Sequence, residues 1–203
     1  MPGSGSTRSS GSICVARFSR AELQEFRGRS IPDLVGPGLK LLFVGINPGL
    51  WTAATQTPFA HPGNRFYPAL VTAGILPELP DFVNGFTPDY RATFMSLGLG
   101  ISNLVNRATA RADELTRDEL RAGAERLRLN VAVWRPRVVA VVGITAYRDA
   151  FGRPKATQGR QDETLEGAEL WVLPNPSGLN AHDTIATLAA AYAEPARAAG
   201  VLR

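Results

Sequence analysis

Two runs that are apolar throughout except for Lys40 constrain the fold of this chain more than any other feature. Residues 39–44 form one run, which Gly45 ends, and residues 138–142 form another, which Gly143 ends. A strand with one face in water alternates apolar and polar residues, whereas a continuous apolar run is typical of a strand buried on both faces of a parallel sheet. The two runs therefore predict an α/β fold.

Further strands and helices extend this prediction. A third apolar segment covers residues 170–173 and ends at Pro174, and a fourth strand is expected within residues 97–104. Thr116 and Glu119 have the spacing of a capping box. Strands that alternate with helices predict a three-layer α/β/α sandwich around a mostly parallel, four-stranded sheet. The expected helices cover residues 64–73, 116–134, 145–151 and 183–193.

The N-terminus differs in composition from the rest of the chain. Gly, Ser and Thr dominate residues 2–12, which offer too little apolar surface to offset the entropy lost on ordering. We expect residues 1–18 to be a disordered tail and a short helix to begin at Ser19, a residue suited to an N-cap. A chain of 203 residues falls in the range of one domain, here residues 19–203.

The content of cysteine and histidine argues against a metal centre. Cys14 is the one cysteine, and the two histidines, His61 and His182, are far apart in the sequence. A four-thiolate cluster and a disulfide framework are excluded, and we expect no metal and no cofactor. No apolar run approaches the ~20 residues that span a bilayer, so we expect a cytoplasmic protein without a membrane partner, associated with the nucleoid in a bacterium.

The charge balance is compatible with a polyanionic partner. Lys and Arg total 22 against 18 acidic residues, which gives a formal net charge of +4. Nearly all of the basic residues are Arg, whose guanidinium suits bidentate contacts with phosphate. A general bias in surface composition would look the same, so the charge alone leaves both interpretations open.

Unusual sequences follow the first and last predicted strands, where active sites of open α/β sheets lie. The first motif is Gly-Ile-Asn-Pro-Gly-Leu at residues 45–50, and the second is Pro-Phe-Ala-His-Pro-Gly-Asn-Arg-Phe-Tyr at residues 58–67. The third is Pro-Asn-Pro-Ser-Gly-Leu-Asn at residues 174–180. Each string alone is ordinary turn chemistry, but their order and their places beyond two strands are specific.

Together these motifs resemble the mismatch-specific uracil-DNA and thymine-DNA glycosylases of the uracil-DNA glycosylase superfamily, from about Gly38 to the end of the last helix. The resemblance implies a monofunctional hydrolase that flips uracil, with other modified pyrimidines as candidates, out of double-stranded DNA and leaves an abasic site for base excision repair. It implies a preference for G·U mismatches. The expected partner is double-stranded DNA with a mismatched or damaged pyrimidine, bound by a monomer.

The resemblance assigns base binding and catalysis to the first two motifs. Phe59 would be the aromatic platform, the backbone of Ile46 and Phe59 would face the uracil edge, and Gly45 would permit the close approach of the backbone to the base. Asn47 would be catalytic and would position water for attack on the anomeric carbon. An amide cannot act as a general base, so catalysis would rely on stabilising the departing uracil anion. The alternative is that Asn47 only shapes its turn, as Asn before Pro often does.

The third motif resembles the segment that fills the gap left by the flipped base. Leu179 would be the wedge, and the backbone of Gly178 and Asn180 would read the opposing guanine. Asn175 and Ser177 would support this turn. The alternative is that Leu179 packs into the core at the start of the last helix.

Several residues depart from the family pattern or have open roles. Ala181 stands where several relatives carry Arg, which predicts looser discrimination of the opposing base unless His182 replaces the contact. Asn103 stands where relatives often carry Lys, so one charge directed at phosphate is missing. His61 is expected to support the pocket. Arg65 is a candidate for phosphate contact or loop support, with exposed helix charge as the alternative.

The segment at residues 76–94 does not match the family closely and reads as a Pro-rich loop with several carboxylates. Asp89 is the one that we select as a second catalytic candidate, to polarise water or stabilise the sugar cation. Solvated loop carboxylates are more common, so this assignment depends on where the fold places Asp89.

Two other functions and one other subclass of glycosylase compete with this interpretation. A nucleotide-binding α/β enzyme is disfavoured because the first motif lacks both the P-loop ending and the spacing of a dinucleotide fingerprint. A non-catalytic DNA-binding relative is disfavoured by the presence of Asn47 and Phe59. The four-cysteine glycosylases are disfavoured by the single cysteine. Lyase activity is not expected, because the chain has only two lysines, Lys40 and Lys155, and neither is expected to be available at the motifs to form a Schiff base.

Overall fold

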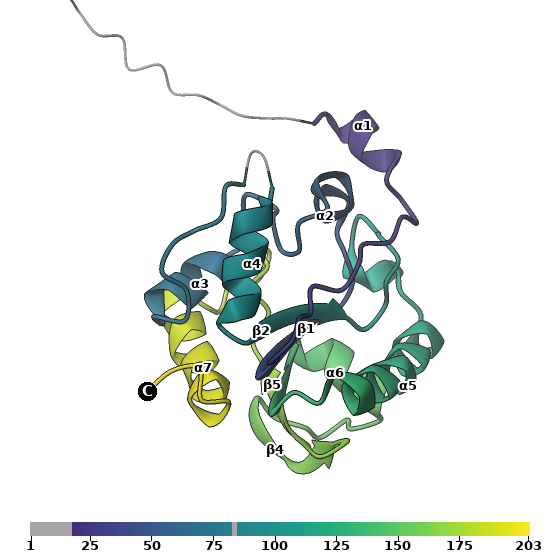
Figure 1. Ribbon diagram of the computed structural model, residues 1–203. Coiled ribbons are helices and arrows are strands. Elements are labelled where there is room, and N and C mark those ends of the chain that lie inside the picture. The colour runs from purple at the N-terminus through teal and green to yellow at the C-terminus, as the bar shows by residue number, and fades with distance from the viewer. Residues whose placement is uncertain (1–17, 83–84) are drawn as a thin grey trace, which may run out of the picture.

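The computed structural model of the chain describes residues 18–82 and 85–203. Nearly all of the predicted tail, residues 1–17, lies outside the described residues, as does Cys14. Figure 1 shows the arrangement of the elements. In chain order they are α1 (Arg20–Gln24), β1 (Leu41–Gly45), α2 (Leu50–Thr55), α3 (Phe66–Thr72), α4 (Pro88–Ser96), β2 (Leu99–Asn103), the short 3₁₀ helix η1 (Ala112–Glu114), α5 (Arg117–Trp134), β3 (Val138–Val142), α6 (Ile144–Phe151), β4 (Gly159–Leu165), β5 (Ala168–Leu173) and α7 (Ile185–Ala198).

The central sheet has five strands in the order β2-β1-β3-β5-β4. The pairs β1–β2, β1–β3 and β3–β5 are parallel, and β4 pairs with β5 in the antiparallel direction. The predicted α/β sandwich with a mostly parallel sheet is confirmed, but the predicted count of four strands was wrong. The additional strand is β4, whose sequence Gly-Arg-Gln-Asp-Glu-Thr-Leu has no apolar run because an edge strand is only half covered.

Helices cover both faces of the sheet, as Figure 1 shows. Leu41 and Phe43 of β1 belong to the core under α3, α4 and α7. Leu42 and Val44 point to the opposite face and pack with residues of α5 and α6. Side chains of a strand alternate between faces, so a strand covered on both faces must be apolar throughout. This burial explains the continuous runs that predicted β1 and β3.

Local signals set several helix ends. Thr116 caps α5 and forms a capping box with Glu119, as predicted. Two helices were not predicted: α2, which begins after Gly49, and α4, which Thr87 caps with Pro88 at the first helical position. The expectation of a loop throughout residues 76–94 was therefore wrong, since α4 begins within it.

Within residues 18–82 and 85–203, no helix combines the length and the apolar character that a membrane crossing requires. In the same part of the chain, no three or more His, Cys, Asp or Glu side chains gather in a geometry suited to a metal ion.

The parallel strands bring the motifs to one edge of the sheet. Gly45 at the end of β1 is paired in register with Asn103 at the end of β2. Val142 of β3 is paired with Leu173 of β5. The first and third motifs follow β1 and β5, so the fold places both beyond the same edge of the sheet, where ligands bind in this class of fold.

Candidate active site

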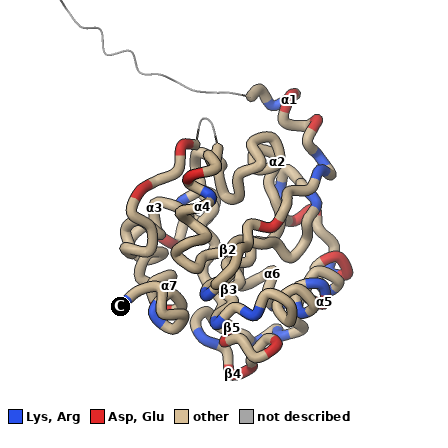
Figure 2. The backbone as a smooth tube through the Cα atoms, viewed as in Figure 1, with Lys and Arg blue, Asp and Glu red and all other residues tan. Residues whose placement is uncertain are grey.

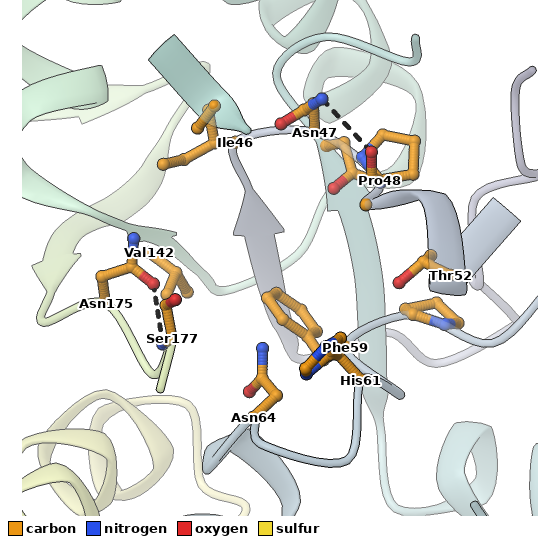
Figure 3. A pocket seen from close by; sticks show the side chains of 14 residues that line it. Ile46, Asn47, Pro48, Thr52, Phe59, His61, Asn64, Val142, Asn175 and Ser177 are labelled. Atoms are coloured by element: carbon orange, nitrogen blue, oxygen red, sulfur yellow. Dashed lines mark hydrogen bonds between the residues drawn. The ribbon is translucent and has the colours of Figure 1, made fainter. Parts of the chain in front are cut away.

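A cavity of about 170 Å³ lies beyond the carboxyl ends of the central strands. Figure 3 shows side chains of all three motifs around it. The lining includes Asn103 from β2 and Val142 from β3, so the sheet itself forms the floor. The lining residues are Ile46, Asn47, Pro48, Gly49, Thr52, Pro58, Phe59, His61, Asn64, Asn103, Ala112, Val142, Asn175 and Ser177.

The second and third motifs are in direct contact. The backbone N–H of Arg65 donates to the carbonyl oxygen of Pro176 at 3.0 Å. A Cβ atom added to Gly178 would lie 2.7 Å from the carbonyl oxygen of Gly63, closer than a side chain can approach. Gly178 therefore permits this contact between the two loops, which face the same cavity.

The side chain of Asn47 is held in one orientation. Its Nδ2 atom donates to the carbonyl oxygens of Pro48 at 3.2 Å and Arg107 at 2.9 Å, and Figure 3 shows the amide nitrogen turned towards Pro48. The same atom lies 2.7 Å from the hydroxyl of Thr109, which itself donates to the carbonyl of Arg111. Three acceptors around one atom identify it as the nitrogen. The amide oxygen is thus the acceptor left for another donor, as the positioning of a water molecule requires.

Phe59 has the geometry of a platform. Its ring stacks on the ring of Phe66, with centroids 4.1 Å apart and planes inclined by 20°. The side chain is only half-buried and lines the cavity, so one ring face is backed by the core while the ring remains accessible. Its φ of 56° is uncommon for a bulky residue, which indicates that the surrounding structure imposes this conformation.

Gly45 keeps the floor of the cavity open. A Cβ atom at this position would lie 2.7 Å from Oδ1 of Asn103 and 3.1 Å from Cζ of Phe59. Ile46, the next residue, is half-buried and lines the cavity. The structure therefore places Gly45, Ile46 and Phe59 together, as expected for the base-binding group.

Asn103 is a cavity residue whose position sequence reasoning missed. It is 7% exposed, and its side chain lines the cavity beside Gly45. Arg126 donates to its carbonyl oxygen at 2.7 Å, which anchors the end of β2. In the sequence, Asn103 stands out only as the loss of a charge, but a polar residue at the carboxyl end of a buried strand is also a signal of a ligand site.

The third motif forms a tightly bonded turn. The backbone N–H of Asn180 donates to the carbonyl of Ser177 at 2.9 Å, and the N–H of Ser177 donates to Oδ1 of Asn175 at 3.0 Å. Nδ2 of Asn180 donates to the carbonyl of Asn175 at 2.9 Å. At the tip, Leu179 is 90% exposed. The alternative in which Leu179 packs into the core was wrong.

Arg65 supports this turn from the second motif. Its guanidinium donates to the carbonyl oxygens of Ser177 and Asn180, both at 2.7 Å, and also to that of Asp183. Arg65 is half-buried. Its hydrogen bonds favour loop support over phosphate contact or an exposed helix charge. An arginine can hold three carbonyls at once because its guanidinium carries five N–H donors in a fixed plane.

His61 lies at the mouth of the cavity. Its Nδ1 atom accepts a hydrogen bond from the backbone N–H of Gly63 at 3.1 Å, which requires this nitrogen to be unprotonated. The ring also makes an edge contact with Trp51 at 6.1 Å between centroids. Both contacts fix the second motif, in line with the supporting role expected for His61.

Neutral amides dominate the chemistry of the cavity. The lining includes Asn47, Asn64, Asn103 and Asn175, and it contains no carboxylate among the residues that the structure describes. Asp89 is exposed in the first turn of α4 and is not part of the lining. A carboxylate there favours the helix start through the helix dipole. The catalytic role suggested for Asp89 thus has no support in the geometry.

Comparisons with known proteins match the chain to a family and to a known fold. The family model of the uracil DNA glycosylase superfamily matches residues 32–194. A solution NMR structure of a protein from Methanosarcina acetivorans, provisionally described as a uracil DNA glycosylase, is similar with a TM-score of 0.54 and 16% sequence identity. This similarity covers 83% of the present chain and 98% of the other chain, and at such low identity it concerns the fold.

Proposed function

Because the chain belongs to the uracil-DNA glycosylase superfamily, we propose that it is a monofunctional glycosylase that excises uracil from double-stranded DNA, preferentially from G·U mismatches. One observation carries the proposal: the oriented amide of Asn47, the accessible ring of Phe59 and the exposed Leu179 belong to loops around a single cavity. An extruded base needs a stacking surface, donors along its edge and a plug for its vacancy.

The proposed reaction uses groups that the cavity presents. Uracil stacks on Phe59, and its polar edge meets the side-chain amide of Asn103 and the backbone near Ile46. The bond between the sugar C1′ and the base N1 breaks, and its electron pair leaves with the uracil anion, which N–H donors stabilise. Water held by the amide oxygen of Asn47 then adds to C1′, and the proton that it releases neutralises the anion.

Preference for a mismatch would come from the third motif. Leu179 would enter the base stack as the uracil leaves, and the backbone of Gly178 and Asn180 would meet the opposing guanine. Ala181 offers no long side chain here, and His182 is exposed beside it, so we propose a weaker dependence on the opposing base than an Arg would give.

The product would be an abasic site that other enzymes of base excision repair process. We propose that the protein acts as a monomer in the cytoplasm, on the nucleoid if it is bacterial, and that double-stranded DNA with a mismatched or damaged pyrimidine is its partner. Thymine and modified pyrimidines remain candidate substrates, since their acceptance depends on space at the C5 edge.

Single-turnover excision tests the proposal directly. The substrates are duplexes with U opposite G, U opposite A and T opposite G, together with single-stranded U. We expect Asn47→Ala to slow excision by about 100-fold or more, in the range seen when a positioned polar group is removed from an active site. Asn130→Ala, on α5 and outside the cavity lining, is the matched control and should excise at the wild-type rate.

Two results would contradict the proposal. Equal rates for the wild type and Asn47→Ala would remove the role of Asn47. A wild-type protein that shifts a G·U duplex but yields no alkali-labile site would be a non-catalytic DNA-binding relative, and binding of labelled nucleotide without DNA affinity would favour a nucleotide-binding enzyme.

A further inference from the structure

Two buried tyrosines donate hydrogen bonds in the same way to backbone carbonyls of the second and third motifs. Tyr67 of α3 and Tyr192 of α7 are both fully buried. The hydroxyl of Tyr67 donates to the carbonyl oxygen of Pro58 at 2.6 Å, and the hydroxyl of Tyr192 donates to that of Pro174 at 3.0 Å. Pro58 directly precedes the platform residue Phe59, and Pro174 opens the third motif.

We propose that Tyr67 and Tyr192 are positioning residues: Tyr67 aims the backbone N–H of Phe59 into the base pocket, and Tyr192 fixes the base of the turn that carries Leu179. This inference rests on the proposed function and deepens it. Neither tyrosine lines the cavity, so each acts through the proline carbonyl that it binds.

The geometry of the peptide group links the Tyr67 hydroxyl to the pocket. The carbonyl of Pro58 and the N–H of Phe59 belong to one planar peptide group, in which they point in opposite directions because the bond is trans. A carbonyl held towards the buried Tyr67 therefore turns the N–H of Phe59 the other way. Among the described residues, no hydrogen-bond acceptor is recorded for this N–H, which leaves it available to a ligand.

The strained backbone of Phe59 makes such an anchor necessary. A non-glycine residue with φ of 56° lies in a sparsely populated region and persists only where its surroundings determine it. Stacking on Phe66 fixes the ring, but rotation of the peptide group would still redirect the N–H. The bond from Tyr67 opposes that rotation.

Tyr192 completes the set of bonds that hold the third motif. Beyond Pro174, the carbonyl of Asn175 accepts from Asn180, that of Pro176 accepts from Arg65, and that of Ser177 accepts from both. Four successive carbonyls from Pro174 to Ser177 thus have donors. Tyr192 supplies the first of these bonds, at the point where the chain leaves β5.

Burial keeps both hydroxyls in the donating form. Removal from water raises the pKa of Tyr67 and the pKa of Tyr192 well above the usual value for tyrosine. Both phenols are therefore protonated at neutral pH, where each hydroxyl can donate its hydrogen bond. Each hydroxyl contributes one directed hydrogen bond. Substitution by Phe removes that bond while the ring stays in the core.

The test compares three Tyr→Phe variants. Tyr147→Phe is the control, because Tyr147 is also fully buried but donates to Glu163, a residue of β4 outside the cavity lining. Each protein is assayed for single-turnover excision on a G·U duplex and for melting temperature. Base extrusion is followed by 2-aminopurine fluorescence in a duplex whose 2′-fluoro-deoxyuridine resists cleavage.

We expect Tyr67→Phe to lower the excision rate constant at saturating protein by about 10- to 100-fold, as small misplacements of reacting groups do, with base extrusion retained. Tyr192→Phe should reduce the 2-aminopurine signal and duplex excision several-fold, while single-stranded uracil is excised at the wild-type rate. Tyr147→Phe should lower the melting temperature alone.

The outcomes separate this inference from the proposed function. Suppose that the wild type excises uracil and that Tyr67→Phe and Tyr192→Phe match it in excision and extrusion but melt at a lower temperature. The tyrosines then only stabilise the fold, and the inference fails. If the wild type extrudes the base without excising it, the proposed function fails. In that case the inference is judged by extrusion: loss of signal in Tyr192→Phe supports it, and an unchanged signal overturns it.

Discussion

The absence of a side chain at Gly45 is what leaves room for a base beside Phe59 and Asn103. Because a Cβ atom would lie 2.7 Å from Oδ1 of Asn103 and 3.1 Å from Cζ of Phe59, Gly45→Ala must displace one of them. We expect uracil excision by Gly45→Ala to fall by about 100-fold, since 1 Å of misplacement can cost that much. Single-turnover kinetics measure the loss.

Gly152→Ala separates loss of stability from loss of the cavity. Gly152 ends α6 with φ of 63°, and nothing lies within 4 Å of an added Cβ, so alanine there strains only the backbone. We expect a lower melting temperature with an unchanged excision rate. If Gly45→Ala excised uracil as fast as Gly152→Ala, the steric argument for Gly45 would be refuted.

Leu179 permits a second test at the scale of one side chain. It is 90% exposed, so Leu179→Ala removes almost no packing, and the free energy of unfolding should change by less than about 0.5 kcal/mol. We expect excision from a G·U duplex to fall about tenfold and excision from single-stranded DNA to remain unchanged, because only a duplex has a gap to fill. Equal losses on both substrates would show that Leu179 is not a wedge.

Sequence reasoning located the residues that belong to specific motif strings and missed those whose role depends on distant partners. Asn47, Phe59 and Leu179 were selected from motif strings, and the structure brings them to loops around one cavity. Arg65 was left undecided, because the carbonyls that it binds lie more than 100 positions away. Asp89 was selected from its place in a supposed loop and is instead the first-turn acid of a helix.

At the scale of elements, burial decides which strands can be predicted from the sequence. Burial on both faces leaves a continuous apolar run, which is why β1 and β3 could be predicted from sequence. The edge strand β4 has exposed and half-buried positions that hold polar residues, so nothing in its composition distinguishes it from a loop. The short helix α2 was missed because its N-cap, Gly49, has no side chain that could accept a capping hydrogen bond and so mark the helix start in the sequence.

The start of α5 supports the loop that carries Asn47 and gives a pH-dependent prediction. Arg107, whose carbonyl holds Asn47, is paired with Glu119 at 2.8 Å. Hydrogen bonds from Arg107 and then from the backbone of Thr116 lower the pKa of Glu119 from 4.5 to about 2. A lowered pKa means that the ionised form stabilises the fold above pH 4.5 and that this contribution is lost as the pH falls towards 2.

Urea unfolding at a series of pH values checks this contribution, with Glu119→Gln as the comparison. We expect the wild-type midpoint to exceed that of Glu119→Gln near neutral pH, and the difference to shrink between pH 4.5 and about 2 as Glu119 becomes protonated. A difference that stays constant over this window would show that the carboxylate charge makes no contribution.

At the scale of the whole molecule, charge has little part in defining the site. Figure 2 shows Lys and Arg on several elements and interspersed with acidic residues along α5, with no continuous basic stripe in that view. Arginines close to the motifs are occupied within the protein: Arg65 holds the third motif and Arg107 pairs with Glu119. Selectivity should therefore depend on the cavity and the wedge more than on net charge.

The positions of the two lysines predict that the product is an abasic site in an intact strand. The chain has two lysines, and neither lines the cavity. Lys40 directly precedes β1, one strand length or roughly 16 Å from the end at Gly45. Lys155 follows α6, which runs for about 12 Å from its start at the cavity edge.

A Schiff base with the abasic sugar requires an amine in contact with C1′, and neither lysine can supply it. We expect borohydride to trap no covalent adduct between the protein and a uracil-containing duplex, and the abasic strand to stay intact until alkali is added. A trapped adduct would mean that another amine reaches C1′. Its persistence in a Lys40→Ala/Lys155→Ala double variant would then locate that amine outside the two lysines, and the reaction would be that of a lyase rather than simple hydrolysis.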